Sequence, residues 1–222
     1  MAPRPGAGSR TTPVAEAPAA LAALRERDPV MADLIERYGD PDGVLARRGR
    51  RPGDAYGALV RSIVGQQLST KAARTIFERL AALYGDRTPT PRELLGTDPE
   101  ELRRVGLSRM KVVFLRDLAQ HVEDGELDLE HLAELPDDEV QAQLTAVKGL
   151  GPWTVHMFQI FHLGRPDVLP VGDLGIRRAV QVEYGLEGLP DPPELERIAA
   201  PWRPWRSLAC LYLWRSLDNT PD

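Results

Sequence analysis

The sequence of 222 residues contains a single cysteine, Cys210, and this scarcity excludes several kinds of protein. One cysteine forms neither a disulfide framework within the chain nor a cysteine-ligated zinc site or a four-cysteine iron–sulfur cluster. Long hydrophobic runs are missing too, since no stretch approaches the roughly 18 uncharged apolar residues of a membrane span. Residues 1–18 have no apolar run, which excludes a secretory signal there and predicts a disordered tail. We therefore expect a cytoplasmic enzyme or binding protein.

Runs of alternating apolar and polar residues are also absent, whereas helical spacing recurs along the chain. In residues 56–64, five apolar residues fall on one face of a helix. Asp28 before Pro29 and Ser69 before a second periodic run are typical of helix N-caps. The sequence therefore predicts an all-α fold made of many short helices.

Residues 144–155 have the pattern of two helices joined by a tight turn. We expect one helix to end at residues 147–148, and Pro152 suits the first position of the next helix. Between them, Gly149 and Gly151 permit positive φ angles and the close approach of another backbone. Their amides would lie at a helix N-terminus, which favours a bound anion. A helix corner without any ligand fits this spacing equally well.

Asp173 is a candidate for a chemical role because of its position. It follows Pro170-Val171-Gly172 and precedes a periodic apolar run, so we expect it to cap a helix. A helix N-terminus also keeps a carboxylate ionised. Capping alone explains an isolated aspartate, and a role in catalysis needs further support from the surrounding motifs.

Three blocks of residues supply that support: Ile63–Ser69 with its following helix, Val147–Phe158 together with Asp173, and Trp202–Trp214. The chain resembles the helix–hairpin–helix DNA glycosylases over most of residues 55–215. Trp153 and the Trp-Arg-Pro-Trp-Arg-Ser sequence are similar to the alkylpurine branch, the 3-methyladenine DNA glycosylase II (AlkA-type) enzymes.

The resemblance implies a compact form of that fold, without the extra N-terminal β-rich domain of longer members. Two all-α subdomains are expected, with the active-site cleft between them. Residues 19–58 and 180–222 would form one subdomain. Residues 59–179 would form the other, with the helix–hairpin–helix at about residues 137–163.

The resemblance makes Asp173 the catalytic residue. A fixed carboxylate stabilises the oxocarbenium character of the sugar and can orient or deprotonate the attacking water. Lyase-competent relatives carry a nucleophilic lysine where this chain has Trp153. The implied activity is a monofunctional glycosylase that flips out and hydrolyses alkylated purines of the 3-methyladenine and 7-methylguanine type from duplex DNA. Base excision repair would then continue from the abasic site.

The same resemblance implies a base pocket in which Trp153 and Trp214 stack on the flipped base. Tyr56 and Met157 are weaker candidates, and their alternative is packing on a helix face. Trp202 and Trp205 are interpreted as structural.

The loop Gly65–Ser69 is expected to fill the gap in the base stack, with Gln67 as the inserted residue and Leu68 beside it. A buried helix corner is the alternative. The residues expected to contact the DNA backbone are Gly149, Gly151, Lys148, Thr154, Ser108 and Lys111. The carbonyl oxygens of Thr145, Val147 and Gly149 are expected to hold a structural sodium or potassium ion, while catalysis needs no cofactor.

The net charge of −5 is an average over segments of opposite sign. Residues 60–80 contain four basic residues and one acid, and residues 103–118 contain five and one. Residues 201–217 contain three basic residues and no acid, whereas residues 122–139 contain nine acids and no lysine or arginine. This pattern excludes indiscriminate coating of nucleic acid and predicts a narrow, salt-sensitive face for duplex DNA. We expect a monomer, because a protein that searches DNA for lesions has no need of symmetry.

Three other interpretations remain open at this point. The first is a non-catalytic helix–hairpin–helix DNA-binding module. The second is a glycosylase for another damaged or mismatched base, such as oxidised guanine, mismatched adenine or uracil. The third is an acidic helical interaction protein, which leaves the three blocks unexplained.

Overall fold

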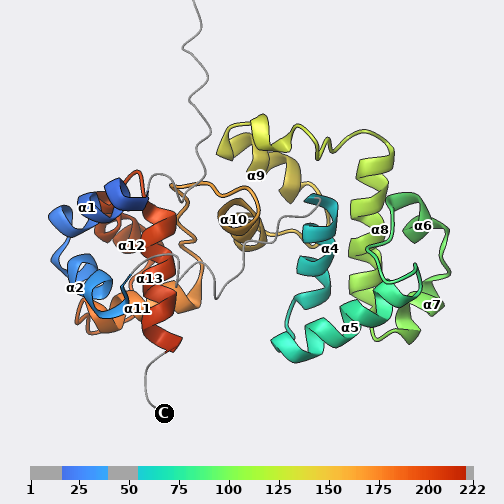
Figure 1. Ribbon diagram of the computed structural model, residues 1–222. Coiled ribbons are helices and arrows are strands. Elements are labelled where there is room, and N and C mark those ends of the chain that lie inside the picture. The colour runs from blue at the N-terminus through green and yellow to red at the C-terminus, as the bar shows by residue number, and fades with distance from the viewer. Residues whose placement is uncertain (1–16, 40–54, 219–222) are drawn as a thin grey trace, which may run out of the picture. The chain divides into compact units, whose positions relative to one another are not determined.

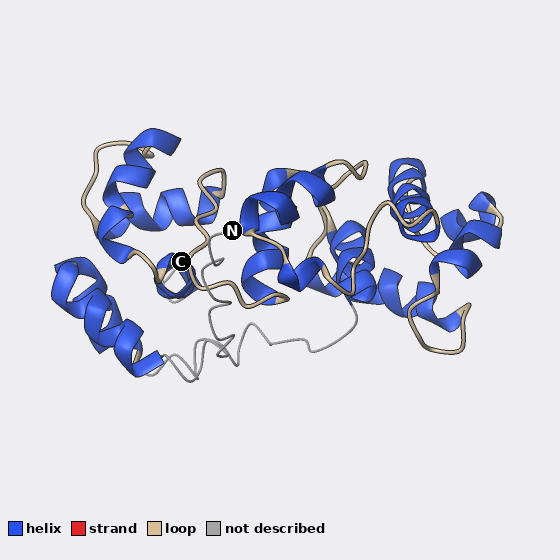
Figure 2. Cartoon of the chain, turned by 90° about the horizontal axis from the view of Figure 1, so that it is seen from above, coloured by secondary structure: helices blue, strands red, loops and turns tan. Residues whose placement is uncertain are grey.

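The computed structural model describes residues 17–39 and 55–218, and every regular element in these ranges is a helix (Figures 1 and 2). The all-α prediction is therefore confirmed for the described residues. None of their helices is long and apolar enough to cross a membrane. The predicted tail overlaps α1 at Ala17 and Pro18, and the rest of it lies outside the described residues.

The chain divides into two compact units. We call residues 1–50 with 164–222 unit 1, and residues 51–163 unit 2. The helices of unit 1 are α1 (Ala17–Arg27), α2 (Pro29–Tyr38), α11 (Leu174–Glu183), α12 (Pro192–Ile198), η2 (Ala200–Trp202) and α13 (Arg206–Asp218). Those of unit 2 are α4 (Ala55–Gly65), α5 (Thr70–Ala82), α6 (Pro91–Gly96), α7 (Pro99–Arg104), α8 (Arg109–Glu123), η1 (Leu132–Glu134), α9 (Asp137–Thr145) and α10 (Pro152–Phe161).

In unit 1, α13 packs against α11 and α2, and α1 packs against α2 and η2. The buried carboxylate of Asp28 joins these elements. Its Oδ1 accepts hydrogen bonds from the first amides of α2, as the sequence predicts for an N-cap, and its Oδ2 accepts the Tyr184 hydroxyl and the Trp202 indole N–H, at 2.5 and 2.8 Å. Four donors satisfy a charge that would otherwise be costly to bury. Trp202 is thus a structural residue, as the sequence indicates.

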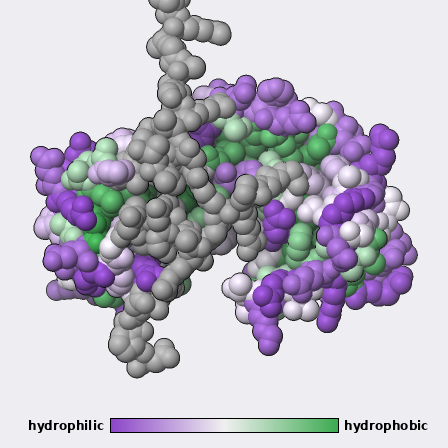
Figure 3. Space-filling view, viewed as in Figure 1, coloured by the Kyte–Doolittle hydropathy of each residue, from purple (hydrophilic) through white to green (hydrophobic). Residues whose placement is uncertain are grey.

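In unit 2, α8 is the central helix, and it packs against α4, α6 and α7, while α10 packs against α9 and α4. Figure 1 shows α4 and α8 side by side. One continuous apolar core fills the space between these helices, with Leu59, Ile63, Leu115 and Val155 fully buried. The outer edge of this unit is mostly hydrophilic in Figure 3, as amphipathic helices require.

The division between the units differs from the boundaries expected at residues 58/59 and 179/180. The expected second boundary would cut α11, which belongs wholly to unit 1 because its buried face, including Ile176 and Val180, packs on α13. At the other boundary, Tyr56 is already part of the unit 2 core. Residues 40–54 lie outside the described residues.

Local signals predict the helix starts well. Ser69 caps α5, Asp173 caps α11, and Pro152 occupies the first turn of α10. The helix expected to end at residues 147–148 ends at Thr145, two residues earlier. The helix–hairpin–helix therefore comprises α9, residues 146–151 and α10.

Candidate active site

Asp173 is buried, with 8% of its surface exposed, at the N-terminus of α11. Its Oδ1 accepts the Ile176 amide at 2.8 Å, which is the N-cap bond that the sequence predicts. The same oxygen accepts the indole N–H of Trp214 at 2.9 Å. These two bonds fix the carboxylate at the positive end of a helix, which is suitable for a group that must be ionised and oriented.

Trp214 is a buried residue of α13, so its indole N–H reaches Asp173 from a neighbouring helix. Gly175 leaves room for this pair. A Cβ atom on Gly175 would lie 3.0 Å from Asp173 Oδ1 and 3.2 Å from Trp214 Cδ1 and Nε1. Cys210, one turn earlier on α13, is buried, and burial together with the Asp173 charge raises the pKa of its thiol. The raised pKa keeps the Cys210 thiol protonated at neutral pH, so this residue supplies no thiolate to the site.

The loop that leads to Asp173 is anchored to the first turn of α13. The Ser207 amide donates to Pro166 O at 3.0 Å, and Ser207 Oγ accepts the Val168 amide at 3.0 Å. Arg206 binds the Asp167 carboxylate through Nε at 2.6 Å and the Asp167 carbonyl through Nη2 at 2.6 Å. The first turn of α13 thus anchors residues 166–168 of this loop. The sequence shows the basic Trp-Arg-Pro-Trp-Arg-Ser block but does not show that Arg206 pairs with an acid 39 residues away.

In the hairpin, the two glycines have different roles. Gly149 has φ +85°, and a Cβ atom there would lie 2.3 Å from the Phe114 ring, so no other residue fits. Gly151 has φ −82°, and a Cβ atom on it would meet nothing within 4 Å. The positive φ that both glycines permit is therefore used at Gly149 and not at Gly151. Within the described part of the chain, neither glycine amide donates a hydrogen bond, so both are available to an anion.

Other polar groups of the hairpin are bound within unit 2. Lys148 donates to Asp117 on α8 twice, from its amide and from its ammonium, each at 2.8 Å. Although burial acts in the opposite direction, these bonds hold the pKa of Asp117 below its usual value. Thr154, which the sequence assigns to the DNA backbone, is buried. Gln66, which the sequence did not single out, donates from Nε2 to Gly149 O at 2.7 Å.

The α4–α5 loop presents the two expected insertion residues at the surface. Gln67 is exposed and has φ +57°, a left-handed conformation that costs a residue other than glycine on the order of 1–3 kcal/mol. Leu68 is 38% exposed. Conformations of this kind occur at functional sites and persist where the surrounding contacts hold them.

Lys111 and Ser108 lie at the start of α8. Ser108 caps this helix through its hydroxyl, which accepts the Lys111 amide at 3.2 Å. The Lys111 ammonium donates to the Val64 carbonyl of α4 at 2.9 Å, and burial lowers the pKa of this amine. In the structure, Lys111 therefore binds the end of α4 next to the loop.

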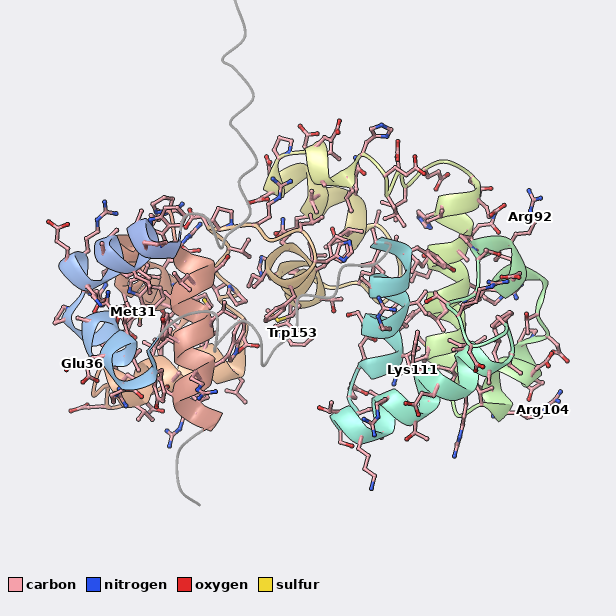
Figure 4. The ribbon with its side chains drawn as sticks, in the orientation of Figure 1. Met31, Glu36, Arg92, Arg104, Lys111 and Trp153 are labelled. Atoms are coloured by element: carbon pink, nitrogen blue, oxygen red, sulfur yellow. The ribbon has the colours of Figure 1, made fainter. Side chains whose placement is uncertain are left out.

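Trp153, at the start of α10, is 48% exposed, and Figure 4 shows its side chain beside that helix. Met157 follows one turn later on the same face and is half-buried. His156 lies on this face too, and burial lowers its pKa, so its imidazole is neutral at pH 7. Sequence reasoning had not selected His156.

Tyr56 lies in the first turn of α4. It is buried in the unit 2 core and lines a cavity of about 720 Å³ together with residues 55, 88–91, 122, 125 and 127–130. It precedes Gly65 by nine residues, or roughly 14 Å along α4. The structure therefore places Tyr56 at the opposite end of α4 from the α4–α5 loop, and core packing explains it.

No cluster of three or more His, Cys, Asp and Glu side chains that could bind a metal occurs in residues 17–39 and 55–218. Of the carbonyl oxygens expected to bind a monovalent ion, that of Val147 accepts the Leu150 amide, and that of Gly149 accepts Gln66. A carbonyl oxygen has two lone pairs, so an ion could share these atoms.

Unit 2 contains a helix–hairpin–helix whose two glycine amides are available to an anion, and unit 1 contains a carboxylate fixed at a helix N-terminus. This combination is the one expected of a DNA-repair protein. Residues 60–204 match the family described as the HhH-GPD superfamily base excision DNA repair protein. The chain belongs to this superfamily.

Known relatives narrow the similarity to one branch. The chain is 32% identical over 214 residues to DNA-3-methyladenine glycosylase 2 of Escherichia coli, an alignment that covers 86% of this chain and 72% of the relative. A Bacillus subtilis relative is 30% identical over 169 residues, and this match spans 59% of its length. Among solved structures, the Schizosaccharomyces pombe 3-methyladenine DNA glycosylase (Mag1) in complex with abasic DNA is 30% identical, with a TM-score of 0.76 over 90% of this chain and 97% of that one.

Proposed function

We propose that this protein is a monofunctional DNA glycosylase that excises alkylated purines, of the 3-methyladenine and 7-methylguanine type, from duplex DNA. The observation that carries the proposal is the buried Asp173 carboxylate, which the Ile176 amide and the Trp214 indole hold in place, in a chain of a base excision repair family. The product is an abasic site, which the later steps of base excision repair process.

Asp173 acts on the sugar side of the reaction. As the N-glycosidic bond breaks, its two electrons leave with the base, and positive charge grows on the deoxyribose. The fixed carboxylate stabilises that charge, and it orients or deprotonates the water that forms the new C1′–O bond. An N3- or N7-alkylated purine already carries a positive charge, so it departs as a neutral base without protonation by an acid.

The absence of lyase activity follows from the side chains near the hairpin. Schiff-base chemistry needs a free amine that can attack C1′. Trp153 has none, and Lys148, the lysine of the hairpin, is ion-paired to Asp117. Hydrolysis by water is the route that remains. The exposed ring of Trp153 is suited to stack on a cationic base, which gains from a π face.

DNA binding by a monomer rests on the hairpin and the α4–α5 loop. The amides of Gly149 and Gly151 approach a phosphate, and the α4–α5 loop fills the gap that base flipping leaves. A structural sodium or potassium ion on the carbonyls of Thr145, Val147 and Gly149 remains part of the proposal. It would orient the hairpin and take no part in bond breaking.

The test uses duplexes that contain 3-methyladenine, 7-methylguanine, 1,N6-ethenoadenine or hypoxanthine. Half of each sample is treated with alkali after incubation with the protein. Base release with strand scission only after alkali is expected for the two cationic bases. Scission without alkali contradicts the monofunctional mechanism, and excision confined to neutral bases favours a glycosylase of another specificity. Binding without base release from any duplex favours a non-catalytic module.

A further inference from the structure

Gln66 links two segments of unit 2 that are far apart in the sequence. It lies in the α4–α5 loop, and its Nε2 donates to the carbonyl of Gly149, 83 residues away in the hairpin, at 2.7 Å. The side chain is half-buried, whereas that of the next residue, Gln67, is exposed. The two adjacent glutamines therefore differ: one faces the protein and the other faces outward.

The helix α8 contacts both the end of α4 and the hairpin. Near its start, the Lys111 ammonium binds Val64 O, at the end of α4, at 2.9 Å. One turn later the Phe114 ring packs against Gly149, which only a glycine permits. Further along, Asp117 accepts both the amide and the ammonium of Lys148. The α4–α5 loop and the hairpin thus share one support, and Gln66 is their direct connection.

The hydrogen bond from Gln66 to the hairpin affects the backbone conformation of the next residue, Gln67. Gln67 has φ +57°, which only surrounding contacts can maintain in a residue with a side chain. Its neighbour Gln66 is fixed at both ends, by its backbone in the turn and by its amide on the hairpin. An anchored neighbour restricts the backbone of Gln67 and sets the direction of its side chain.

We infer that Gln66 is a positioning residue, which sets the distance between the loop that enters the base stack and the hairpin amides that bind the phosphate. The inference rests on the proposed function, because it needs both segments to contact the same duplex. With the connection intact, the two segments bind DNA as one preformed unit. Without it, each must be placed separately on binding, at a cost in conformational entropy.

The experiment measures binding to a duplex with a tetrahydrofuran abasic analogue and to an undamaged duplex at one salt concentration. Gln66→Met removes the donor and keeps the length of the side chain. It is expected to weaken binding to the analogue duplex by about threefold to tenfold and to leave the undamaged duplex nearly unaffected. Gln120→Met is the matched control, because it removes an exposed amide of α8 whose bonds go to Asp124.

A double-mutant cycle gives a readout that a merely structural role would not move. Gln67→Ala and Gly151→Ala are made singly and together, in the natural background and in the Gln66→Met background. We expect their effects on analogue binding to deviate from additivity by about threefold or more in the natural background, and to become additive after Gln66→Met. Gln66→Asn, whose shorter side chain falls short of Gly149, is expected to act in the same way and replaces Gln66→Met if that variant unfolds.

Additive effects in both backgrounds, or unchanged coupling after Gln66→Met, overturn the inference. If the natural protein still excises alkylated purines and prefers the analogue duplex, the proposed function stands in that case. If the natural protein does neither, the proposed function and the inference fail together. Equal losses from Gln66→Met and Gln120→Met would assign the effect to general destabilisation and would also overturn the inference.

Discussion

Two aspartates that are largely withdrawn from solvent, Asp173 in unit 1 and Asp117 in unit 2, differ in the groups that hold them. The Asp117 side chain is 14% exposed and pairs with the ammonium of Lys148, so a cation balances its charge. The two donors to Oδ1 of Asp173 are a backbone amide and an indole N–H, and both are neutral. Neutral dipoles at Oδ1 orient the carboxylate without themselves carrying a net charge. The two carboxylates are therefore held by different kinds of donor, but neutral donors alone do not indicate a catalytic role, because they also hold the structural Asp28.

The largest expected effect tests this distinction at Asp173 itself. Asn in place of Asp173 keeps an oxygen that can accept the Ile176 and Trp214 bonds but removes the negative charge. We expect the single-turnover rate of base excision to fall by about 10²–10³-fold, since electrostatic stabilisation of the transition state is lost. Binding to abasic-analogue DNA, measured by fluorescence anisotropy, should change little. Full activity in Asp173→Asn would show that another group does the chemistry.

The two hairpin glycines provide the next contrast. Gly149→Ala combines a left-handed conformation with a collision against Phe114, and we expect a loss of about 2–4 kcal/mol in the free energy of unfolding. Gly151→Ala has neither problem, so its thermal unfolding should match that of the natural protein. Its affinity for DNA should still fall, because the new methyl group stands where a phosphate approaches. Normal DNA binding by a folded Gly151→Ala variant would place the phosphate contact elsewhere.

Trp214→Phe tests the hydrogen bond from the indole to Asp173 separately from the packing of the aromatic ring. The variant loses the indole N–H and keeps a ring, and we expect kcat to fall roughly tenfold with little change in KM. Trp202→Phe is the matched control, since it removes the same group from Asp28 in the same unit. That control should lower thermal stability and leave kcat in place.

The smallest expected effect concerns the charge-paired aspartate. The pKa of Asp117 is held below the ordinary value of 3.8 in the folded protein, so its ionised form stabilises the fold above that pH. Because Lys148 is mostly exposed, Asp117→Asn should cost only about 0.5–1 kcal/mol at pH 7. The difference from the natural protein should shrink as the pH falls from 3.8 through the lower pKa of the folded state, where the Asp117 carboxyl becomes neutral. Denaturant unfolding at a series of pH values from neutral to acid measures it, and a difference that does not shrink at acid pH would contradict the ion-pair explanation.

The sequence predicts those features of the site that depend on neighbouring residues. The hairpin, the N-cap at Asp173 and the first turn of α10 all follow from short-range signals, because capping and φ preferences act within a few residues. Tyr56 shows where this reasoning stops. Its helical periodicity correctly predicts a buried face but does not say which cavity or core that face borders.

The contacts that organise the site join residues far apart in the chain. Gln66 reaches Gly149 across 83 residues, Trp214 reaches Asp173 across 41, and Lys148 reaches Asp117 across 31. Nothing in the local pattern distinguishes Gln66 from Gln67, yet the fold turns one inward and leaves the other exposed.

By itself, the sequence determined the helices, their caps, the hairpin and the family to which the chain belongs. It did so because each of these depends on residue types at fixed short spacings. Only the tertiary structure decided that Gly149 uses a positive φ and Gly151 does not, that Lys148 and Lys111 bind protein groups, and that Trp214 donates to Asp173. The packing of α8 and α13 against distant segments sets these pairings, and no local spacing encodes them.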